Sequence, residues 1–430
     1  MQLKSLLLIF IFFIFTISVA TDNVCKIVYK PPGPFHTPRK YQPIVQQLKN
    51  IIHKNNWKTN FDMAVSDAHK TGAIEMVNIR NLKEYYNFLN YLVLWVPTED
   101  ETGTFVYRML VTMYFVLDQE TVKPFQSPVV PWYPSPPLTE LSQWIVDFAN
   151  DMGKFLNTSQ SLTEKSLQTF YTAQNYNVDA YEVSEGGWLG HSYNEFFARK
   201  FLPGTRPIDG PSNPAVIVSA ADSTFDGCWD IDDDSIVTFK GLPWSIKELL
   251  KDSKYANDFA GGKFMHAFLG PYDYHRQHAP VSGKVLEAKV IPGQAYLEVT
   301  VQQDPNGKLR LKPIRRMRKM NAGNVTELNA PNSPGYQFCQ ARGLIVIDSP
   351  IGKVAVLPIG MAQVSSVVLS THENATVYKG EEISYFQFGG SDIVLVFQAQ
   401  SKVNILANES KHYRVGEQIA ISHKKIIKLS

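Results

Sequence analysis

The stretch ISYFQFGGSDIVLVF, residues 383–397, decides the fold of this chain. Apolar residues dominate both of its ends, which is typical of β-strands. Paired glycines weaken a strand and usually mark a kink or a close approach of two backbones. Gly389-Gly390 therefore separates two strands, and Ser391 follows a carbonyl that no bulky side chain shields. A bulge in a β-domain explains this motif when it is taken alone. A serine that attacks its own peptide bond explains it when a base lies nearby.

The chain on both sides of this stretch, from about residue 210, carries a β pattern. Short apolar runs recur between Gly, Pro and Asn, as in a compact antiparallel β-domain. One helix is expected at 244–250, and the polar residues 303–335 predict a long loop or insertion. The predicted strands are 215–219, 284–290, 296–301, 343–347, 353–357, 364–369, 383–386 and 393–397.

The half of the chain before residue 180 has a helical period instead. Apolar residues recur three and four positions apart in stripes at 44–52, 82–92 and 138–155. The aromatic residues of these stripes are expected in a core rather than in a cofactor site. The fold class is therefore α+β, with a helical N-terminal domain at 44–180 and a β-rich domain at 186–430.

The first residues have the layout of a signal peptide, which we expect to end at Ala20. Lys4 precedes a long apolar run, and Ser18-Val19-Ala20 provides a small-x-small cleavage site. A retained membrane anchor is the alternative, although the run is short for a span. Residues 21–43 are rich in proline and predict an extended lead-in. We expect a protein of the secretory pathway, secreted or held in an endomembrane lumen, and its glycosylation motifs agree: Asn157, Asn324, Asn374 and Asn408.

Composition excludes some classes of function. The 430 residues are enough for two structural units, and a net charge of +2 gives no case for nucleic-acid binding. Cys25, Cys228 and Cys339 are too few for a disulfide framework, and at most one pair can form.

A basic run within residues 303–335 has two interpretations. The simpler one is a solvated loop, and the alternation of its cations with Leu309 and Leu311 suggests a strand with one charged face. The functional one is contact with anionic lipid headgroups, which gain roughly 1 kcal/mol per basic residue. The run comprises Lys308, Arg310, Lys312, Arg315, Arg316, Arg318 and Lys319.

Two further segments carry residues suited to proton transfer. DYHRQHAP, residues 273–280, places His275 and His278 three positions apart, and histidine titrates near neutral pH. An apolar strand leads to Asp222, and a carboxylate can orient a histidine in a nucleophile–base–orienter arrangement. Core histidines and a turn aspartate are the simpler explanations. A zinc site on the two histidines is a further one, but the Glu of His-Glu-x-x-His and a nearby Cys are missing.

Together and in this order, these segments resemble the phosphatidylserine decarboxylase family of pyruvoyl-dependent enzymes. The resemblance spans roughly residues 190–400, and the helical half is similar to the extra domain of a branch that includes fungal decarboxylases of free aromatic amino acids. The matching pieces are Phe196-Phe197-x-Arg199, Pro203-Gly204-x-Arg206-Pro207-Ile208, Ser219-x-Ala221-Asp222, Lys240-Gly241-x-x-Trp244-Ser245, Asp273-Tyr274-His275-Arg276-x-His278-x-Pro280, Lys379-Gly380-Glu381-Glu382 and Phe388-Gly389-Gly390-Ser391.

The resemblance implies a set of site residues. Ser391 would attack the carbonyl of Gly390, with His278 as the base and Asp222 holding that base. The chain would break between residues 390 and 391, and Ser391 would become a covalent pyruvoyl (pyruvate) cofactor. The pyruvoyl ketone would take up the electrons released as carbon dioxide leaves a substrate amine, much as a pyridoxal ring does. His275 would serve this decarboxylation step, and no metal would be required.

Two departures from the family pattern concern efficiency and substrate. The chain has Ala220-Ala221-Asp222-Ser223 where Pro-Ala-Asp-Gly is common, and Asp392 replaces the usual Thr. We expect Asp392 to bring a carboxylate beside the new cofactor. The first hypothesis for function is conversion of phosphatidylserine to phosphatidylethanolamine. The alternatives are decarboxylation of a free amino acid such as tryptophan, and a secreted, catalytically silent homologue that acts as a binding protein. The resemblance also suggests a homodimer.

Overall fold

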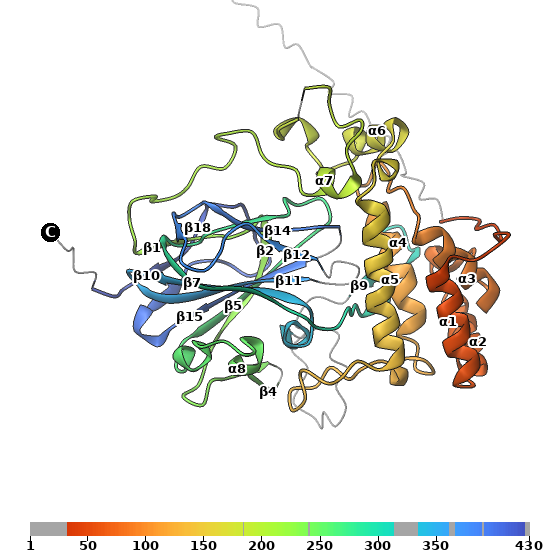
Figure 1. Cartoon of the computed structure of the whole chain (residues 1–430), viewed down its shortest axis with the longest axis horizontal. Coiled ribbons are helices and arrows are strands. Elements are labelled where there is room, and N and C mark those ends of the chain that lie inside the picture. The colour runs from red at the N-terminus through yellow and green to blue at the C-terminus, as the bar shows by residue number, and fades with distance from the viewer. Residues whose placement is uncertain are drawn as a thin grey trace, which may run out of the picture.

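The computed structural model describes residues 32–183, 185–239, 241–313, 334–360, 366–388 and 391–425. The predicted signal peptide, Cys25, Asn324 and Gly390 lie outside these residues. The helices gather at one end of the molecule and the β-strands at the other (Figure 1). This arrangement confirms the α+β class with the helical half first.

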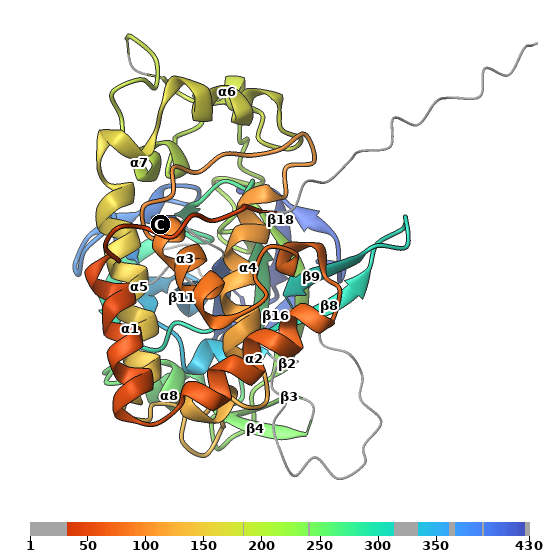
Figure 2. The ribbon, with the colours of Figure 1, turned by 90° about the vertical axis from the view of Figure 1, so that its right-hand side faces the viewer.

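Within the described part of the N-terminal half, six α-helices pack together. Figure 2 looks onto this layer, with α4 near its middle. The three predicted stripes form α1, α3 and α5, whereas α2, α4 and α6 were not predicted. The helices are α1 (Pro43–Lys54), α2 (Lys58–Lys70), α3 (Leu82–Leu92), α4 (Phe105–Leu117), α5 (Glu140–Leu156) and α6 (Glu164–Thr172).

An antiparallel sheet of eight strands forms the centre of the other half, in the order β13-β7-β10-β11-β15-β5-β2-β17. The strand β15 lies inside this sheet and pairs along its whole length with β11 on one side and β5 on the other. The strands are β13 (Thr376–Val377), β7 (Gly283–Ile291), β10 (Arg342–Ser349), β11 (Gly352–Gly360), β15 (Ser391–Phe397), β5 (Lys263–Leu269), β2 (Ser223–Asp230) and β17 (His412–Tyr413).

Smaller sheets and short helices complete the β-rich half. One small sheet contains β1 (Val216–Val218), β18 (Gln418–Ser422) and β16 (Val403–Ile405). A second contains β12 (Val367–Leu369), β14 (Glu382–Phe386) and β6 (Arg276–His278). The hairpins are β3 (Ile236–Phe239) with β4 (Leu242–Ser245) and β8 (Val299–Gln303) with β9 (Leu309–Pro313), and the short helices are α7 (Tyr193–Phe197) and α8 (Ile246–Leu249).

The hairpin β8–β9 joins the two halves and corrects two predictions. The expected loop at 303–335 begins as this hairpin, and residues 314–333 lie outside the described residues. The backbone amide of Leu311 donates to Glu75 at 3.1 Å, so β9 is tied to the helical half. Arg310 is only 5% exposed and its Nε lies 3.1 Å from an oxygen of Asp304. Arg310 therefore stabilises this junction and does not face a membrane.

Of the other residues in the basic run, only Lys308 and Lys312 lie within the described residues. Lys308 and Lys312 are exposed, while Arg315, Arg316, Arg318 and Lys319 fall outside the described residues. The predicted helix at 244–250 is also shorter than expected, because its first residues belong to β4. In the ranges that the structure covers, no helix combines the length and the apolar character needed to cross a bilayer.

Candidate active site

The two segments that flank the predicted cleavage site belong to different sheets. On the upstream side, the amide of Phe386 at the end of β14 donates to the carbonyl of His275 at 2.9 Å. The amide of Phe388 donates to Oδ1 of Asn194 at 3.0 Å. On the downstream side, Ser391 is the first residue of β15, opposite Gly360 on β11 and Leu269 on β5. Gly389 and Gly390 lie between these anchored segments but outside the described residues.

His278 lies on β6, beside the strand β14 that leads to this point. Its Nδ1 lies 2.7 Å from the carbonyl oxygen of Gly380, and because a carbonyl only accepts, Nδ1 carries the proton. Its Nε2 accepts from the hydroxyl of Tyr274 at 3.1 Å. Burial lowers the pKa of His278, so the ring is neutral at pH 7. A neutral imidazole with its lone pair on Nε2 can act as a general base.

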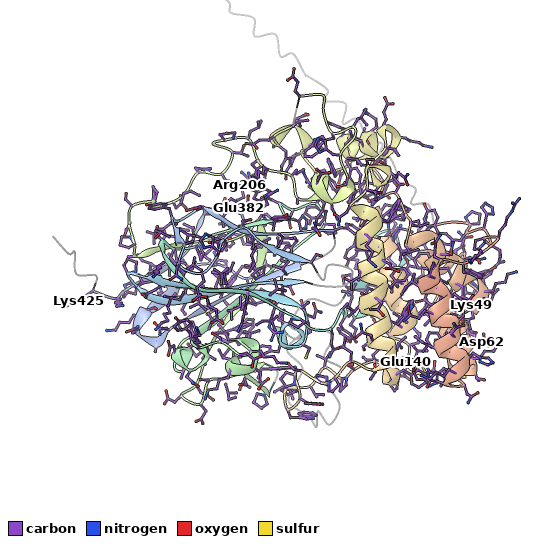
Figure 3. The ribbon with its side chains drawn as sticks, viewed as in Figure 1. Lys49, Asp62, Glu140, Arg206, Glu382 and Lys425 are labelled. Carbon is purple, nitrogen blue, oxygen red and sulfur yellow. The ribbon has the colours of Figure 1, made fainter. Side chains whose placement is uncertain are left out.

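Asp222 is buried, but its carboxylate has partners that we did not expect. The guanidinium of Arg206 binds both carboxylate oxygens, and the amide of Val415 donates to Oδ1 at 2.7 Å. Figure 3 shows Arg206 on the β-rich half. Among the described contacts, no hydrogen bond joins Asp222 to His278. The carbonyl of Gly380 orients the base instead. Burial lowers the pKa of His278, and the negative charge of Asp222 offsets this lowering only in part.

His275 is fully buried in an aromatic cluster next to the cleavage segment. Its ring stacks on Phe197, with 3.8 Å between the ring centroids and 28° between the planes. The other edge of this cluster is Phe388, whose ring packs edge-on against Phe197 at 5.6 Å. Phe197 therefore contacts both the expected decarboxylation residue and the segment that precedes Gly389. The ring of His275 is therefore shielded from solvent.

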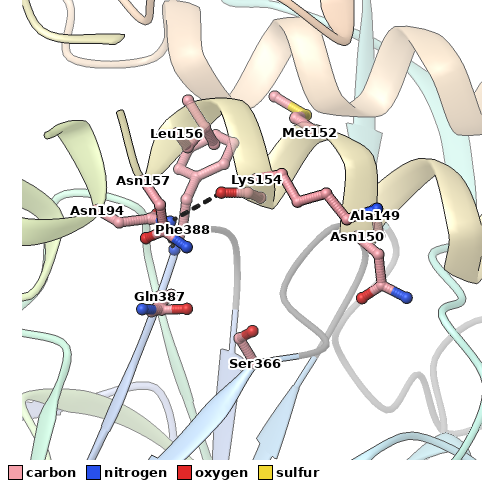
Figure 4. Close-up of a pocket in the computed structure, with 11 residues that line it drawn as sticks. Ala149, Asn150, Met152, Lys154, Leu156, Asn157, Asn194, Ser366, Gln387 and Phe388 are labelled. Atoms are coloured by element: carbon pink, nitrogen blue, oxygen red, sulfur yellow. Dashed lines mark hydrogen bonds between the residues drawn. The ribbon is translucent and has the colours of Figure 1, made fainter. Parts of the chain in front are cut away.

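A cavity of about 310 Å³ opens between α5 and this cleavage segment (Figure 4). The end of α5 contributes Asn150, Lys154 and Asn157 to its lining, and Gln387 and Phe388 face them. The volume lies at the lower end of the range for small-molecule sites. The lining of the cavity combines several amide groups with one ammonium group. The cavity lies between the helical half and the segment that precedes the predicted cleavage site.

Asn194 connects this cavity with the cleavage segment. Its side chain is 3% exposed and accepts from the amide of Phe388 through Oδ1. Its Nδ2 donates to Oδ1 of Asn157 at 2.9 Å, at the end of α5. A single amide therefore holds the helical half and the chain just before Gly389 together.

The carboxylate of Asp392 does not lie where we expected it. Its side chain is fully buried, and Oδ2 accepts from the hydroxyl of Tyr336 at 2.5 Å and from the amide of Gln337 at 3.3 Å. Successive residues of a strand point to opposite faces of a sheet. Asp392 therefore faces away from the side on which residue 391 lies, and it brings no carboxylate beside that residue.

The sequence alone did not identify several of these contacts. Tyr274 and Gly380 lie inside the motifs that match the family, but a motif does not show which atoms meet. Nothing in the sequence connects Asn194 with Phe388, which is far away along the chain. No cluster of three or more His, Cys, Asp or Glu side chains that could hold a metal ion occurs within the described ranges.

Comparison with known proteins identifies the family. The family model for phosphatidylserine decarboxylase matches residues 193–421. A phosphatidylserine decarboxylase proenzyme 3 of Schizosaccharomyces pombe is 32% identical over 238 residues, which are 55% of this chain and 22% of that protein. A phosphatidylserine decarboxylase proenzyme of Clostridium perfringens is 30% identical over 251 residues, 58% of this chain and 74% of that protein.

A third relative is named for a different decarboxylase. The decarboxylase iboD of Amanita muscaria is 29% identical over 240 residues, which are 54% of this chain and 66% of that protein. All three matches cover a little more than half of the chain, as the family model does. On this match and on the geometry above, the chain belongs to the phosphatidylserine decarboxylase family, whose members are pyruvoyl-dependent carboxy-lyases.

Proposed function

We propose that this chain cuts itself between Gly390 and Ser391 and then decarboxylates a substrate that carries an α-amino acid group. One observation carries the proposal: His278, neutral and with Nε2 as an acceptor, lies on the strand beside β14, which leads directly to the scissile bond. The Ser391 hydroxyl is the nucleophile, and the carbonyl of Gly380 fixes the tautomer of the base.

The cleavage proceeds through an ester. The Ser391 hydroxyl adds to the carbonyl carbon of Gly390, and His278 transfers the hydroxyl proton to the departing amide nitrogen. Loss of the Cα proton of residue 391 then breaks its Cβ–O bond and releases a carboxylate on Gly390. Water hydrolyses the remaining enamine, after its tautomerisation to an imine, and ammonia leaves. A ketone remains at position 391, and the products are chains 21–390 and 391–430.

The strand register supports a break at this position. All seven residues of β15 pair with β11 and with β5, and Ser391 is the first of them. A cut before residue 391 therefore removes no pair from the sheet. The residues present fit a pyruvoyl group at this site, because its backbone is held on both sides.

The decarboxylation uses the aromatic cluster and His275. A pyruvoyl ketone at position 391 would supply the electrophile for the substrate amine and the sink for the electron pair that carbon dioxide leaves behind. Phe197 and Phe388 shield the site from water, and His275 returns a proton to the α-carbon of the product. The cavity beneath α5 holds the substrate, with the amides of Asn150 and Asn157 in reach of its polar groups.

Phosphatidylserine is the first candidate substrate, on the strength of the family. One feature favours a free amino acid as the second candidate: the amide-rich cavity that the helical half completes. Vesicles that contain phosphatidylserine and a panel of free amino acids, tryptophan included, distinguish the two by carbon dioxide release. A catalytically silent protein that only binds its ligand would release no carbon dioxide from either substrate.

Intact mass of the purified mature protein tests the cleavage. We expect a large chain that ends at Gly390 and a small chain whose blocked N-terminus reacts with ketone reagents. Ser391→Ala should give one uncut chain. A folded wild-type protein that stays in one piece contradicts both enzyme hypotheses and leaves the silent binding protein.

We also propose the secretory pathway as the compartment of this protein. Among the glycosylation motifs that the structure describes, Asn374 and Asn408 are exposed, so a glycan can be attached there. Asn157 is exposed as well, but its amide lines the cavity and is bonded to Asn194. A mass decrease after peptide-N-glycosidase treatment, with a mature chain that begins after Ala20, supports this compartment. An unglycosylated chain that retains residues 1–20 contradicts it. Light scattering of the same material tests the expected homodimer.

A further inference from the structure

A buried polar cluster lies directly behind residue 391, on the opposite face of the sheet. It consists of Asp392 on β15, His266 on β5, Asp226 on β2, and Tyr336 and Gln337 from the short 3₁₀-helix Pro334–Phe338. We call these five residues the Asp392 clamp. They come from three adjacent strands and one segment that packs over them.

The contacts of the clamp form a continuous chain. Oδ2 of Asp392 accepts from Tyr336 at 2.5 Å and lies 3.4 Å from Nε2 of His266. The opposite ring nitrogen, Nδ1, lies 3.0 Å from Oδ2 of Asp226. The side-chain amide nitrogen of Gln337 lies 2.6 Å from Nε2 of His266 and 3.3 Å from Asp392. An amide NH2 group only donates, so when Nε2 of His266 is protonated the Gln337 amide must turn its oxygen toward the ring. The clamp therefore links β15, β5 and β2 through side chains as well as through the sheet.

The clamp is almost completely removed from solvent. The side chains of Asp392, His266 and Asp226 are 0%, 1% and 7% exposed. Buried charges are tolerated when they are paired and hydrogen-bonded, and removing one partner leaves an uncompensated charge. Burial lowers the pKa of His266, but the carboxylates of Asp392 and Asp226 outweigh it and raise that pKa to about 9. Near neutral pH a cation thus lies between two anions.

Alternate residues of β15 face two different hydrophobic cores, one on each side of the sheet. Ile393 and Leu395 belong to the large hydrophobic core, which also contains Phe197 and Phe388. The alternate residues Val394 and Val396 belong to a second core on the other face of the sheet. Residue 391 shares the face of Ile393, and Asp392 shares the face of Val394. The clamp therefore lies on the face of the sheet opposite to residue 391, and its side chains do not contact that residue's reacting groups.

Position matters at this point because attack on a peptide bond tolerates little displacement. A misplacement of about 1 Å can cost on the order of a hundredfold in rate. Residue 391 has paired neighbours only on its C-terminal side within β15, and after the break it has no upstream residue at all. Residue 391 itself pairs with Gly360 and Leu269, and its immediate successor Asp392 adds the nearest side-chain contacts within β15.

We propose that Asp392 is a positioning residue, which through the clamp fixes residue 391 against β5 during self-cleavage and then holds the new N-terminus in place. The inference rests on the proposed self-cleavage. It assigns to this chain an ionic anchor at the residue that follows the proposed cleavage site.

The test compares two variants on the same face of the same strand. Asp392→Ala removes the clamp's contact to β15, whereas Val394→Ala removes only apolar volume two residues further on. Both are expected to lower the melting temperature, which is measured in a Ser391→Ala background so that every protein is uncut. Cleavage is followed by pulse labelling, as the rate at which the two fragments appear from the soluble folded precursor.

We expect Asp392→Ala to cleave at least tenfold more slowly than Val394→Ala after both rates are normalised to the folded fraction. Asp392→Asn, which keeps the shape and one acceptor, should restore folding but only part of the rate. Equal rates for Asp392→Ala and Val394→Ala overturn the inference, and so does a full rate for Asp392→Asn. If the wild type itself is not cut, the proposed function fails and not the clamp alone.

A second readout does not depend on cleavage. In the uncut Ser391→Ala protein, the imidazole of His266 should stay protonated to well above pH 7 when it is followed by NMR. Asp392→Asn should move this titration to lower pH, because one of the two carboxylates is lost. An unchanged titration shows that Asp392 is not part of the clamp and overturns the inference.

Discussion

His278 and His266 lie in the same β-rich half, and their surroundings give them opposite properties. His278 has a carbonyl and a hydroxyl as its hydrogen-bond partners, so burial dominates and lowers its pKa. His266 is even more deeply buried, but two carboxylates outweigh burial and raise its pKa to about 9. The comparison teaches that the partner, and not burial, decides whether a histidine inside this fold can take up a proton.

The sharpest way to break this comparison is to remove the base. His278→Gln should reduce the rate of self-cleavage by roughly 10²–10⁴-fold, which is the usual contribution of a general base. The fragments are counted on a denaturing gel over time. His372→Ala is the matched control, because His372 is exposed and its Nδ1 contacts only the carbonyl of the adjacent Glu373 among the described side-chain contacts; it should be cut like the wild type. A normal rate in His278→Gln assigns the base to another residue.

The pH dependence of cleavage sharpens the comparison, because His278 should limit the rate at low pH and His266 at high pH. The base must be neutral, and its pKa is lowered, so the rate should fall only at pH values below the ordinary range of histidine. The cation of the clamp is lost as the pH rises through about 9. We therefore expect a rate that is flat near neutrality and falls on both sides. A fall between pH 8 and 6.5 contradicts a lowered pKa for His278.

The same sign applies to stability. A histidine whose pKa is raised by folding stabilises the folded state below its unfolded pKa, near 6.5, and this stabilisation is lost as the pH rises through about 9. The shift corresponds to on the order of 3 kcal/mol. Urea unfolding of the uncut Ser391→Ala protein should show this loss, and His266→Gln should lower stability while removing its dependence on alkaline pH.

A smaller effect is expected at Asp222, which does not contact the base. Asp222→Asn should slow cleavage by about tenfold or less, because the carbonyl of Gly380 still holds the tautomer of His278. The lost charge lowers the pKa of His278 slightly further, and Arg206 loses its carboxylate partner. A loss as large as that of His278→Gln indicates that the carboxylate orients the base directly after all. Arg206→Lys, which keeps the charge but not the bidentate contact, separates the two causes.

The smallest effect on cleavage is expected from the cavity, which lies away from both histidines. Asn150→Leu should leave the cut at Gly390 unchanged and raise KM for the substrate several-fold, because a polar contact is lost. Gln143→Leu on the exposed face of α5 outside this cavity serves as the control. An unchanged KM in Asn150→Leu argues against this cavity as the substrate site.

The sequence predicted the two strands around the proposed cleavage site well because their signals are local. The glycine pair, the flanking strands and the order His275–His278 can all be read from the chain. The helix α4 was missed because eleven of its thirteen residues are buried, so it carries no polar face and no stripe. The strand β5 was missed because His266 interrupts the apolar run KFMHAFL.

The missed contacts have a common cause. His266 and Asp226 look like loop residues in the sequence, yet they are buried, and they form the clamp together with Asp392. Their pairing depends on three strands that are distant along the chain, so no local pattern reveals it. For the same reason, the expected Asp222–His278 contact could not be tested before the position of Arg206 was known.

Because β15 lies inside the sheet, we expect the cut protein to refold far less readily than the uncut precursor. If the proposed cut is made, β15 belongs to a separate chain, 391–430, which is held between β11 and β5 only by hydrogen bonds and packing. The two pieces cannot leave one another unless the sheet opens, and once apart they must meet again to refold. The mature enzyme should therefore melt irreversibly and depend on concentration when it is renatured, whereas the Ser391→Ala precursor should refold by itself.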